Sequence, residues 1–473
     1  MLELTDAAGT KNLDWTKITV DTRPLTGAGQ KSYEAYTQTL MENQAGLSFM
    51  RGGADTYANA GAKNDRESGN YEYFLDTDTH SVAAKKVAIT GYQFKNNKTA
   101  KYEAGDGNHP EAWGGRSAMG RTVTENTLTV KGGTLTEAAY GGLVENYKID
   151  PGTHQPLTTG DAMKNRLAIE GGSIKDAYGA KVATKGGSAE ENTVDITGGS
   201  ITGSVYGGAL TMAGATGSAN KNTINLKANV TGDIYGGFTA GTGKTAQNTV
   251  TIGDGETALN LTFAGILHGG NSTAADGNKG NTLNVKANAT AKNIKNFEHL
   301  IFDLNDKINT ANPMLHLNGG AATTDLDWTK IKADMSRLKG DNIKSYEPLG
   351  QVLMKNANGI NLTGYTGAIE RPYQAGDKFE FSMDTDTHTN NATEINIRGY
   401  QFKDHNAKYE ASDGAHPNAW AGRTAIGNKV ENNTLTVNGT TGTLDTAHGG
   451  WSENNKGTTG DAVNNKLIVN GGT

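Results

Sequence analysis

The chain has 473 residues, including 64 Gly, 8 Pro and no Cys, and its formal net charge is −6. The lack of Cys excludes disulfides, thiolate metal sites and Cys nucleophiles, and the interspersed acidic and basic residues offer no basic surface to nucleic acid. No apolar run approaches the roughly 18 residues that a membrane helix needs.

The first segment, residues 1–124, contains apolar runs of irregular length such as KKVAITGYQF. Alternating apolar residues in such runs are typical of strands. We therefore expect irregular β-coils with long loops in this segment. The tract YEAYTQTLMENQ, which begins at Tyr33, is the one stretch that we expect to be helical.

The second segment, residues 125–304, repeats a short pattern of Asn-Thr-apolar-x-apolar, a Gly-Gly turn, another alternating stretch and Tyr-Gly-Gly. Such a pattern is typical of a stacked β-solenoid, because no single repeat can bury its apolar face alone. Full versions of the repeat begin at Asn126, Asn165, Asn192 and Asn222, and shorter versions begin at Asn248 and Asn281.

Alternation places one aliphatic pair on the same face of every repeat. Stacking the repeats at about 4.8 Å would bury these pairs as continuous rows. The opening Asn residues would stack as an amide ladder, and the tyrosines at positions 140, 178, 206 and 235 would stack as a further row that faces inward or outward. The aliphatic pairs are Leu128 and Val130, Leu167 and Ile169, Val194 and Ile196, Ile224 and Leu226, Val250 and Ile252, Leu283 and Val285, Leu435 and Val437, and Leu467 and Val469.

The third and fourth segments, residues 305–431 and 432–473, repeat the first two. LDWTKI at Leu13 returns at Leu326, DTDTH at Asp76 returns at Asp384, and NTLTV at Asn126 returns at Asn433. We call residues 1–304 the first copy and residues 305–473 the second copy. Because the second copy stops after NGGT, we expect a fragment of a longer protein in which similar coils continue at both ends.

The repeats, followed by NIKNFEHLIFDLNDKINTANPMLHLNGG from Asn293 and by YEYFLDTDT-like segments, resemble passenger regions of autotransporters, the type V secretion proteins. The resemblance implies an all-β chain that forms a right-handed parallel β-helix, a pectin-lyase-like stack with little or no helix. It also implies export to the cell surface, or secretion. The leader and the C-terminal translocating β-barrel of the family are expected in the parent protein.

The function that the resemblance implies is adhesion or aggregation, through loops that contact a glycan or protein of host or bacterial surfaces. The alternative is a carbohydrate-active β-helix, either a polysaccharide lyase or a hydrolase. The paired carboxylates and the GHG and RIK signatures of galacturonan hydrolases are absent from the sequence. We therefore expect no enzyme, and we predict no catalytic residue, no cofactor and no metal site.

The motif DTDTH, at residues 76–80 and 384–388, is the strongest candidate for a site. Its alternating Asp, Asp and His could present three metal ligands on one face of a strand. A polar strand end that leads into a turn explains the same residues without a metal. We favour the turn, and the binding of a metal stays open.

Four histidines lie beside aromatic positions. His268 in LHGGN and His448 in AHGGW replace the Tyr of Tyr-Gly-Gly, which we interpret as one ring substituting for another in a stack. A second pair, His109 and His416, each comes shortly before a Trp, at positions 113 and 420. These rings could form an exposed patch for a sugar, although we favour packing over a coil end.

Overall fold

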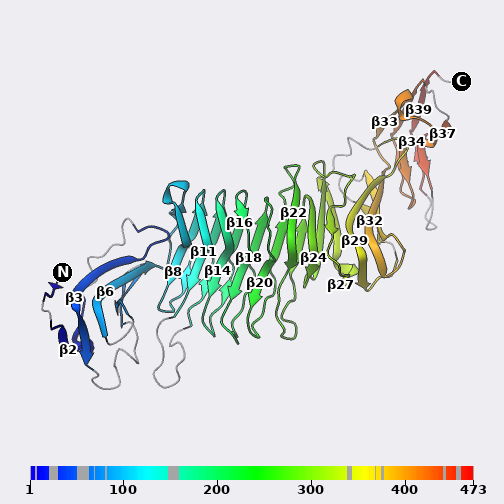
Figure 1. Ribbon diagram of the computed structural model, residues 1–473. Helices are drawn as coiled ribbons and strands as arrows, with labels where there is room; N and C mark the ends of the chain where they lie inside the picture. Colours follow the sequence, from blue (N-terminus) through cyan, green and yellow to red (C-terminus); the bar gives the residue numbers. More distant parts are fainter. Residues whose placement is uncertain are drawn as a thin grey trace. The chain divides into compact units, whose positions relative to one another are not determined.

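The computed structural model describes residues 2–5, 8–20, 30–50, 63–68, 70–79, 83–146, 159–337, 344–367, 369–373, 378–439, 444–453 and 460–471 (Figure 1). Within these ranges the regular structure is β-strand, and no α-helix occurs. Four short 3-10 turns lie at Trp15–Lys17, Ala104–Asp106, Trp328–Lys330 and Ala411–Asp413. The expectation of an all-β chain is therefore confirmed. No helix in the described part of the chain has the length and hydropathy of a membrane span.

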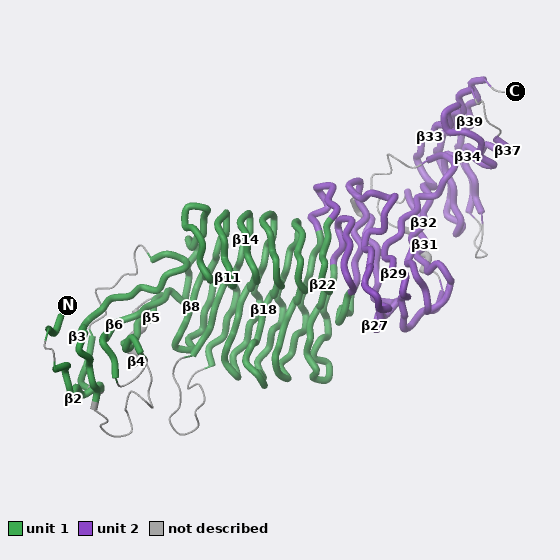
Figure 2. The backbone as a smooth tube through the Cα atoms, viewed as in Figure 1, with its two compact units in different colours: residues 1–252, 261–283, 294–299 green, residues 253–260, 284–293, 300–473 purple. Residues whose placement is uncertain are grey.

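The chain forms two compact units, which Figure 2 colours separately. Unit 1 contains Met1–Ile252, Leu261–Leu283 and Ile294–His299. Unit 2 contains Gly253–Asn260, Asn284–Asn293 and Leu300–Thr473. The segment boundaries at 124, 304 and 431 rest on the repeat pattern and stay predictions.

Unit 1 begins with an antiparallel sheet in the order β3-β6-β5-β4. Side chains on one face of this sheet pack around Trp15, Leu47 and Val87. The short strands β1 and β2 pair with β3 in parallel. The bounds are β1 Leu2–Glu3, β2 Thr10–Asp14, β3 Tyr36–Met50, β4 Lys63–Ser68, β5 Tyr71–Thr77 and β6 Ala83–Gln93.

The helix predicted in YEAYTQTLMENQ is wrong, because Tyr36–Met50 is the strand β3. In this strand Thr37 pairs with Thr90 of β6 and Thr39 pairs with Ala88. Alternating β-branched threonines favour a strand, and an isolated helix of about 12 residues is marginal in water. The partner β6 supplies the long-range ladder that decides between the two structures.

The repeats of unit 1 build parallel sheets in which each strand pairs with its equivalent in the next repeat (Figure 1). β10, β13, β16, β19 and β21 pair in this order without a register shift. Strands β8, β11, β14, β18, β20 and β22 form a second series, and β9, β12 and β15 form a third.

The strands of these repeats have the following bounds: β7 Ala100–Tyr102, β8 Asn108–Ser117, β9 Val123–Thr124, β10 Thr127–Val130, β11 Thr134–Val144, β12 Ala162–Met163, β13 Arg166–Ile169, β14 Ser173–Val182, β15 Ala189–Glu190, β16 Thr193–Ile196, β17 Ser200–Ile201, β18 Val205–Leu210, β19 Thr223–Leu226, β20 Ile234–Thr239, β21 Thr249–Ile252, β22 Asn260–His268, β23 Thr282–Val285 and β24 Asn288–Lys295.

The aliphatic pairs that alternation predicted are buried. Every pair from Leu128 and Val130 to Leu283 and Val285 is 0% exposed. The exception is the last pair of the second copy, because Leu467 is 44% exposed and Val469 is 59% exposed. Both lie on β39, an outer strand of the three-stranded sheet β33-β36-β39, so no further described strand covers them.

The opening asparagines form the predicted ladder within unit 1. The Nδ2 of Asn192 donates to the Oδ1 of Asn222 at 3.0 Å, and Asn222 donates in turn to Asn248 at 3.1 Å. The backbone N–H of each also donates to the next Oδ1. The ladder comprises Asn126, Asn165, Asn192, Asn222, Asn248 and Asn281, each at most 1% exposed. Buried amides of this kind are stable because their hydrogen-bonding groups are satisfied.

The residue before each ladder Asn adopts a left-handed backbone conformation, which the sequence pattern did not predict. The φ angles are 57° at Glu191, 56° at Lys221 and 57° at Gln247. For an L-residue this conformation costs roughly 1–2 kcal/mol. The strain is tolerated because the left-handed residue turns the chain into the parallel strand that follows the ladder Asn.

Unit 2 contains a second antiparallel sheet, in the order β29-β32-β31-β30. The strands β26 and β27 pair in parallel with β29, as β1 and β2 do with β3 in unit 1. The later strands pair in parallel as β33-β36-β39, β34-β37 and β35-β38. The second copy therefore repeats the architecture of the first as well as its sequence.

The strands of unit 2 have the following bounds: β25 His299–Asn305, β26 Leu315–Leu317, β27 Thr323–Asp327, β28 Ile331–Arg337, β29 Leu349–Thr363, β30 Ile369–Tyr373, β31 Phe379–Thr385, β32 Asn391–Gln401, β33 Asn406–Glu410, β34 His416–Thr424, β35 Val430–Glu431, β36 Thr434–Asn438, β37 Leu444–Ser452, β38 Ala462–Val463 and β39 Lys466–Asn470.

Candidate functional site

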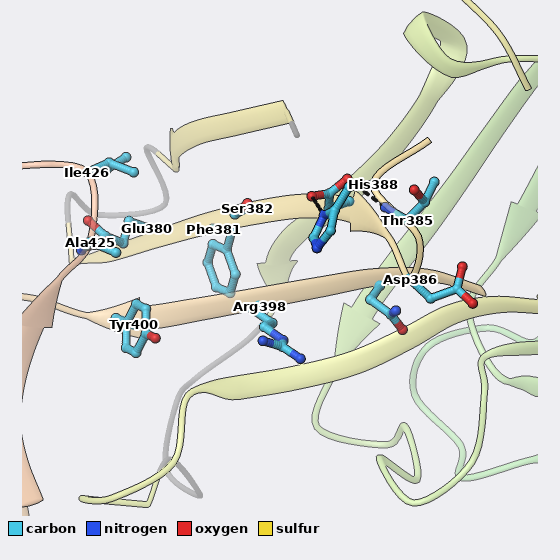
Figure 3. A pocket seen from close by; sticks show the side chains of 12 residues that line it. Glu380, Phe381, Ser382, Thr385, Asp386, His388, Arg398, Tyr400, Ala425 and Ile426 are labelled. Carbon is cyan, nitrogen blue, oxygen red and sulfur yellow. Dashed lines mark hydrogen bonds and ion pairs between the residues drawn. The ribbon is translucent and has the colours of Figure 1, made fainter. Parts of the chain in front are cut away.

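A hollow of about 310 Å³ lies on one face of the antiparallel pair β31 and β32 in unit 2 (Figure 3). We call it the β31–β32 pocket. Its walls carry side chains from both strands, from the turn that joins them and from residues 425–426. A volume at the low end of the range for ligand pockets suits a small molecule or one residue of a polymer.

Strand register explains which side chains share this face. Glu380 lies opposite Tyr400, Ser382 lies opposite Arg398, and Asp384 lies opposite Asn396. Successive side chains of a strand point to opposite faces, so residues 380, 382 and 384 of β31 share one face with their partners on β32. The other face carries the buried Phe379, Met383, Ile395 and Ile397. Phe381 of β31 also lines the pocket.

Asp384, the first residue of the second DTDTH motif, is held by three donors. The Tyr365 hydroxyl donates to its Oδ1 at 2.5 Å, the Thr385 N–H donates to the same oxygen at 2.7 Å, and His388 Nδ1 lies 2.7 Å from its Oδ2. Burial alone would raise the pKa of Asp384, but these hydrogen bonds outweigh burial and lower it. The carboxylate therefore remains ionised near neutral pH.

Asp386, the second acidic residue of the motif, closes the turn between β31 and β32. The N–H groups of Thr393 and Glu394 donate to its Oδ1 at 3.0 and 3.2 Å. In the first copy Asp78 accepts in the same way from Lys85 and Lys86. The interpretation of DTDTH as a strand end that leads into a turn is confirmed at these residues, while His80 lies outside the described residues.

At the second DTDTH motif the described residues form no metal site. Among the described residues, no group of three or more His, Asp or Glu side chains is placed to hold a metal ion. Asp384 and Asp386 accept from different donors, and His388 is paired with Asp384.

Glu380 is a buried carboxylate at one end of the pocket. It accepts hydrogen bonds from the Thr424 hydroxyl at 2.5 Å, from Asn428 Nδ2 at 2.9 Å and from the Ala425 N–H. Burial raises the pKa of Glu380, and these hydrogen bonds only partly oppose the effect. The carboxylate ties the antiparallel sheet to the segment after β34.

Three other polar side chains of the pocket have no partner in the described part of the protein. Ser382, Asn396 and Arg398 make no hydrogen bond or ion pair there. Arg398 is exposed, and Ser382 and Asn396 are partly exposed. Their hydrogen-bonding groups are therefore open to solvent or to a ligand.

Tyr400 forms an aromatic wall at the Glu380 end of the pocket. The guanidinium of Arg423 lies 4.6 Å from the centre of the Tyr400 ring and also lies over Trp420 and Trp451. An ion pair of 2.8 Å with Glu453 holds Arg423 in this position. The ring is thus fixed before any ligand arrives.

The same face is filled in the first copy. Phe74, Ala88 and Thr90 stand at the positions of Ser382, Asn396 and Arg398. Phe74 is 3% exposed and belongs to a core cluster with Tyr92 and Trp113. On this face the first copy therefore buries Phe74 in a core cluster, whereas the second copy has the partly exposed Ser382.

The remaining sequence candidates are structural. The predicted tyrosine row exists along β14, β18 and β20, with ring centroids 4.6 Å apart for Tyr178 and Tyr206 and 5.3 Å apart for Tyr206 and Tyr235. His268 stacks on Tyr235 at 4.4 Å, which confirms that one ring replaces another. His448 stacks on Trp451 of its own strand β37 at 4.8 Å, so its place in a row of rings between repeats stays a prediction.

The exposed aromatic patch considered for His109 and His416 is not present. Trp113 is 6% exposed and Trp420 is 5% exposed, so neither indole is available to a sugar. Each histidine stacks on a tyrosine, His109 on Tyr33 at 3.8 Å and His416 on Tyr346 at 3.7 Å. The favoured interpretation, packing, is confirmed.

Sequence reasoning missed Ser382, Asn396 and Arg398. A usable signal was present, because aligning the two copies shows Ser, Asn and Arg in place of Phe74, Ala88 and Thr90, at alternating strand positions on one face. Comparisons of the whole chain with family models, with curated protein sequences and with solved structures gave no match.

Proposed function

We propose that the chain is a structural passenger segment of an autotransporter, displayed on the cell surface or secreted, that mediates adhesion or aggregation. In this proposal the repeats wind as a right-handed parallel β-helix. The support for winding is that each repeat supplies one strand to each of several parallel series, as β12, β13 and β14 do.

The observation that carries the proposal is the unbroken register of the repeats from β10 to β21, with its buried Asn ladder. Such stacking extends a scaffold by adding equivalent units. It places the loops between strands at regular intervals along the stack. A scaffold of this kind suits the display of contact surfaces better than the enclosure of a reaction.

The proposal also holds that the chain is not an enzyme. The carboxylates of the β31–β32 pocket support this, because Glu380, Asp384 and Asp386 each accept several hydrogen bonds from the chain itself. Carboxylates engaged in this way hold the fold together. The competing function, a polysaccharide lyase or hydrolase, needs acidic and basic groups that converge on a bound sugar.

Adhesion is tested on intact cells that produce the protein. Protease treatment of these cells should release peptides from residues 126–281, and deletion of the repeats should reduce binding of the cells to epithelial layers and to each other. Unchanged binding after deletion, or protection of the peptides on intact cells, contradicts the proposal.

Enzymatic activity is tested separately with the purified chain. Incubation with pectic and host glycans should release no new reducing ends or unsaturated products. Product release at many turnovers per chain contradicts the structural proposal and favours the carbohydrate-active alternative.

A further inference from the structure

We propose that the β31–β32 pocket binds a single neutral pyranose residue of a glycan. Arg398, Asn396 and Ser382 donate to the sugar hydroxyls, and the Asn396 and Ser382 oxygens accept from them. The inference rests on the proposed function, because it names the class of ligand that an adhesive surface would meet.

The first support is that the donors are available. The Ser382 hydroxyl, the Asn396 amide and the Arg398 guanidinium have no partner among the described residues, and strand pairing places them on one face. Together they offer several N–H and O–H donors and two kinds of acceptor. A ring with neighbouring hydroxyls can replace the water on these groups without breaking a bond within the protein.

The second support is the charge around the pocket, which favours a neutral ligand. Three carboxylates, those of Glu380, Asp384 and Asp386, line the pocket together with Arg398 and His388. His388 is already paired with Asp384. An acidic sugar would bring a fourth carboxylate beside these groups, and like charges at short range are costly. Hydroxyl groups suit this mixed set because each can donate and accept.

The third support is the aromatic wall. Tyr400 lines the pocket, and Arg423 fixes its ring at 4.6 Å. An immobilised tyrosine contributes apolar area and a hydroxyl at little cost in conformational entropy. The apolar C–H face of a pyranose can rest against such a wall while its hydroxyls meet the β32 side chains.

The fourth support is the difference between the copies. The three open polar groups replace Phe74, Ala88 and Thr90, and all three changes fall on the same face. The opposite face stays apolar in both copies, with Leu75 and Ile89 in one and Met383 and Ile397 in the other. The fold alone therefore does not require the polar set.

The test uses the full chain and two probes of nearly equal shape in ligand-observed NMR titrations. Methyl β-D-galactopyranoside is neutral, and its uronic acid analogue carries a carboxylate at C6. The neutral probe should bind at least about tenfold more tightly than the acid, which is about 1.4 kcal/mol. Acetate, as a simple anion, should not compete with the neutral probe.

Variants that restore the residues of the first copy locate the site. Asn396→Ala and Arg398→Thr should each weaken binding of the neutral probe by about tenfold. Thr90→Ala, at the position in the first copy that corresponds to Arg398, should leave binding unchanged. The substituted side chains are exposed or partly exposed, and far-UV circular dichroism should confirm that each variant folds as the parent does.

Each contrary result has a distinct meaning. Equal or tighter binding of the uronic acid, competition by acetate, or full binding by Asn396→Ala overturns the proposal for a neutral sugar. Absence of binding of both probes, while cells still adhere, overturns the pocket proposal and leaves the proposed function standing. A third outcome is that the neutral probe binds but deletion of the protein leaves cell adhesion unchanged. This result overturns the proposed function and leaves the pocket proposal standing.

Discussion

Residues 71–94 of the first copy and residues 379–402 of the second form the same antiparallel pair of strands but present different outer faces. The first face holds Phe74 against Tyr92, and the second holds Ser382 opposite Arg398. The glutamates at 72 and 380 are buried in both. The difference teaches that the buried carboxylate is kept in both copies, whereas the position shared by Phe74 and Ser382 can be apolar and buried or polar and partly exposed without changing the topology of the sheet.

The largest expected loss of stability comes from placing a charge at a buried position of the aliphatic rows. Ile196→Asp should cost about 4 kcal/mol or more, because it places a carboxylate without a partner in a row that is 0% exposed. Thr193→Asp, on the partly exposed side of the same strand, should cost less than about 1 kcal/mol. Urea unfolding followed by far-UV circular dichroism measures both changes. Equal losses at the two positions would mean that the inner and outer faces are misassigned.

The buried glutamate should make stability depend on pH. Burial raises the pKa of Glu72 to about 7, although hydrogen bonds from Ala118 and Ser117 oppose the rise. Because the folded state holds this proton more tightly than the unfolded state does, stability should fall as pH rises from about 4.5 to 7, by up to about 3 kcal/mol.

Glu72→Gln should remove this part of the pH dependence, measured as urea midpoints between pH 5 and 7.5. Glu380→Gln is the matched variant in the second copy, where Asn428 adds a hydrogen bond that lowers the pKa. We expect Glu380→Gln to change the slope of urea midpoint against pH less than Glu72→Gln does. An unchanged slope for Glu72→Gln contradicts the assignment of the proton to this carboxyl.

Replacing a ladder asparagine by Ala should lower the stability of the protein more in the first copy than in the second. Asn192→Ala removes donors to Ala162 and Asn222 and leaves their buried groups without a partner, at a cost of about 2 kcal/mol. Asn465→Ala should cost less than half of this, because Asn465 is partly exposed and water can replace its hydrogen bonds. Urea unfolding of the two variants measures the difference, and equal costs would show that burial does not set the strength of the ladder.

The smallest expected change in stability comes from His268, which stacks at the end of the tyrosine row. Burial lowers the pKa of His268 to about 4. The unfolded state therefore binds the proton first, so stability should fall as pH drops from about 6.5 to 4, by about 1–2 kcal/mol after allowance for solvent at its partly exposed ring.

This dependence runs opposite to that of Glu72 and should vanish in His268→Tyr, which restores the ring found in the other repeats. Differential scanning fluorimetry at pH 5 and 7 is sufficient to detect it. A variant that keeps the full acid sensitivity of the parent would assign the effect to another group.

The repeats could be predicted from the sequence because their signals are local and recur. Val194 and Ile196 alternate in the same phase as their equivalents, and Asn192 opens the same pattern, so burial and stacking follow from one repeat unit. The left-handed residue before each Asn carries no such signal, because Glu191, Lys221 and Gln247 share only polarity.

The antiparallel sheets and the pocket could not be predicted from local sequence, because they form between residues that are far apart in the chain. The tract YEAYTQTLMENQ is compatible with a helix by itself, and its pairing with the distant strand β6 makes most of it part of β3. In the same way, nothing in the neighbours of Arg398 indicates whether its guanidinium meets a carboxylate. Only the fold shows that the carboxylates nearby are already occupied by Tyr365, Thr393 and Thr424.

The Asn ladder of unit 1 has a mechanical consequence when the protein is pulled along its repeats. Its hydrogen bonds point from one repeat to the next, so tension along the stack stretches the rungs in series and opens them one at a time. The ladder asparagines are 26 to 39 residues apart. Each opening therefore releases on the order of 90–130 Å of slack chain. Single-molecule pulling between residues 126 and 281 should show successive force peaks at these spacings. Each peak would dissipate load before the next pair of asparagines separates.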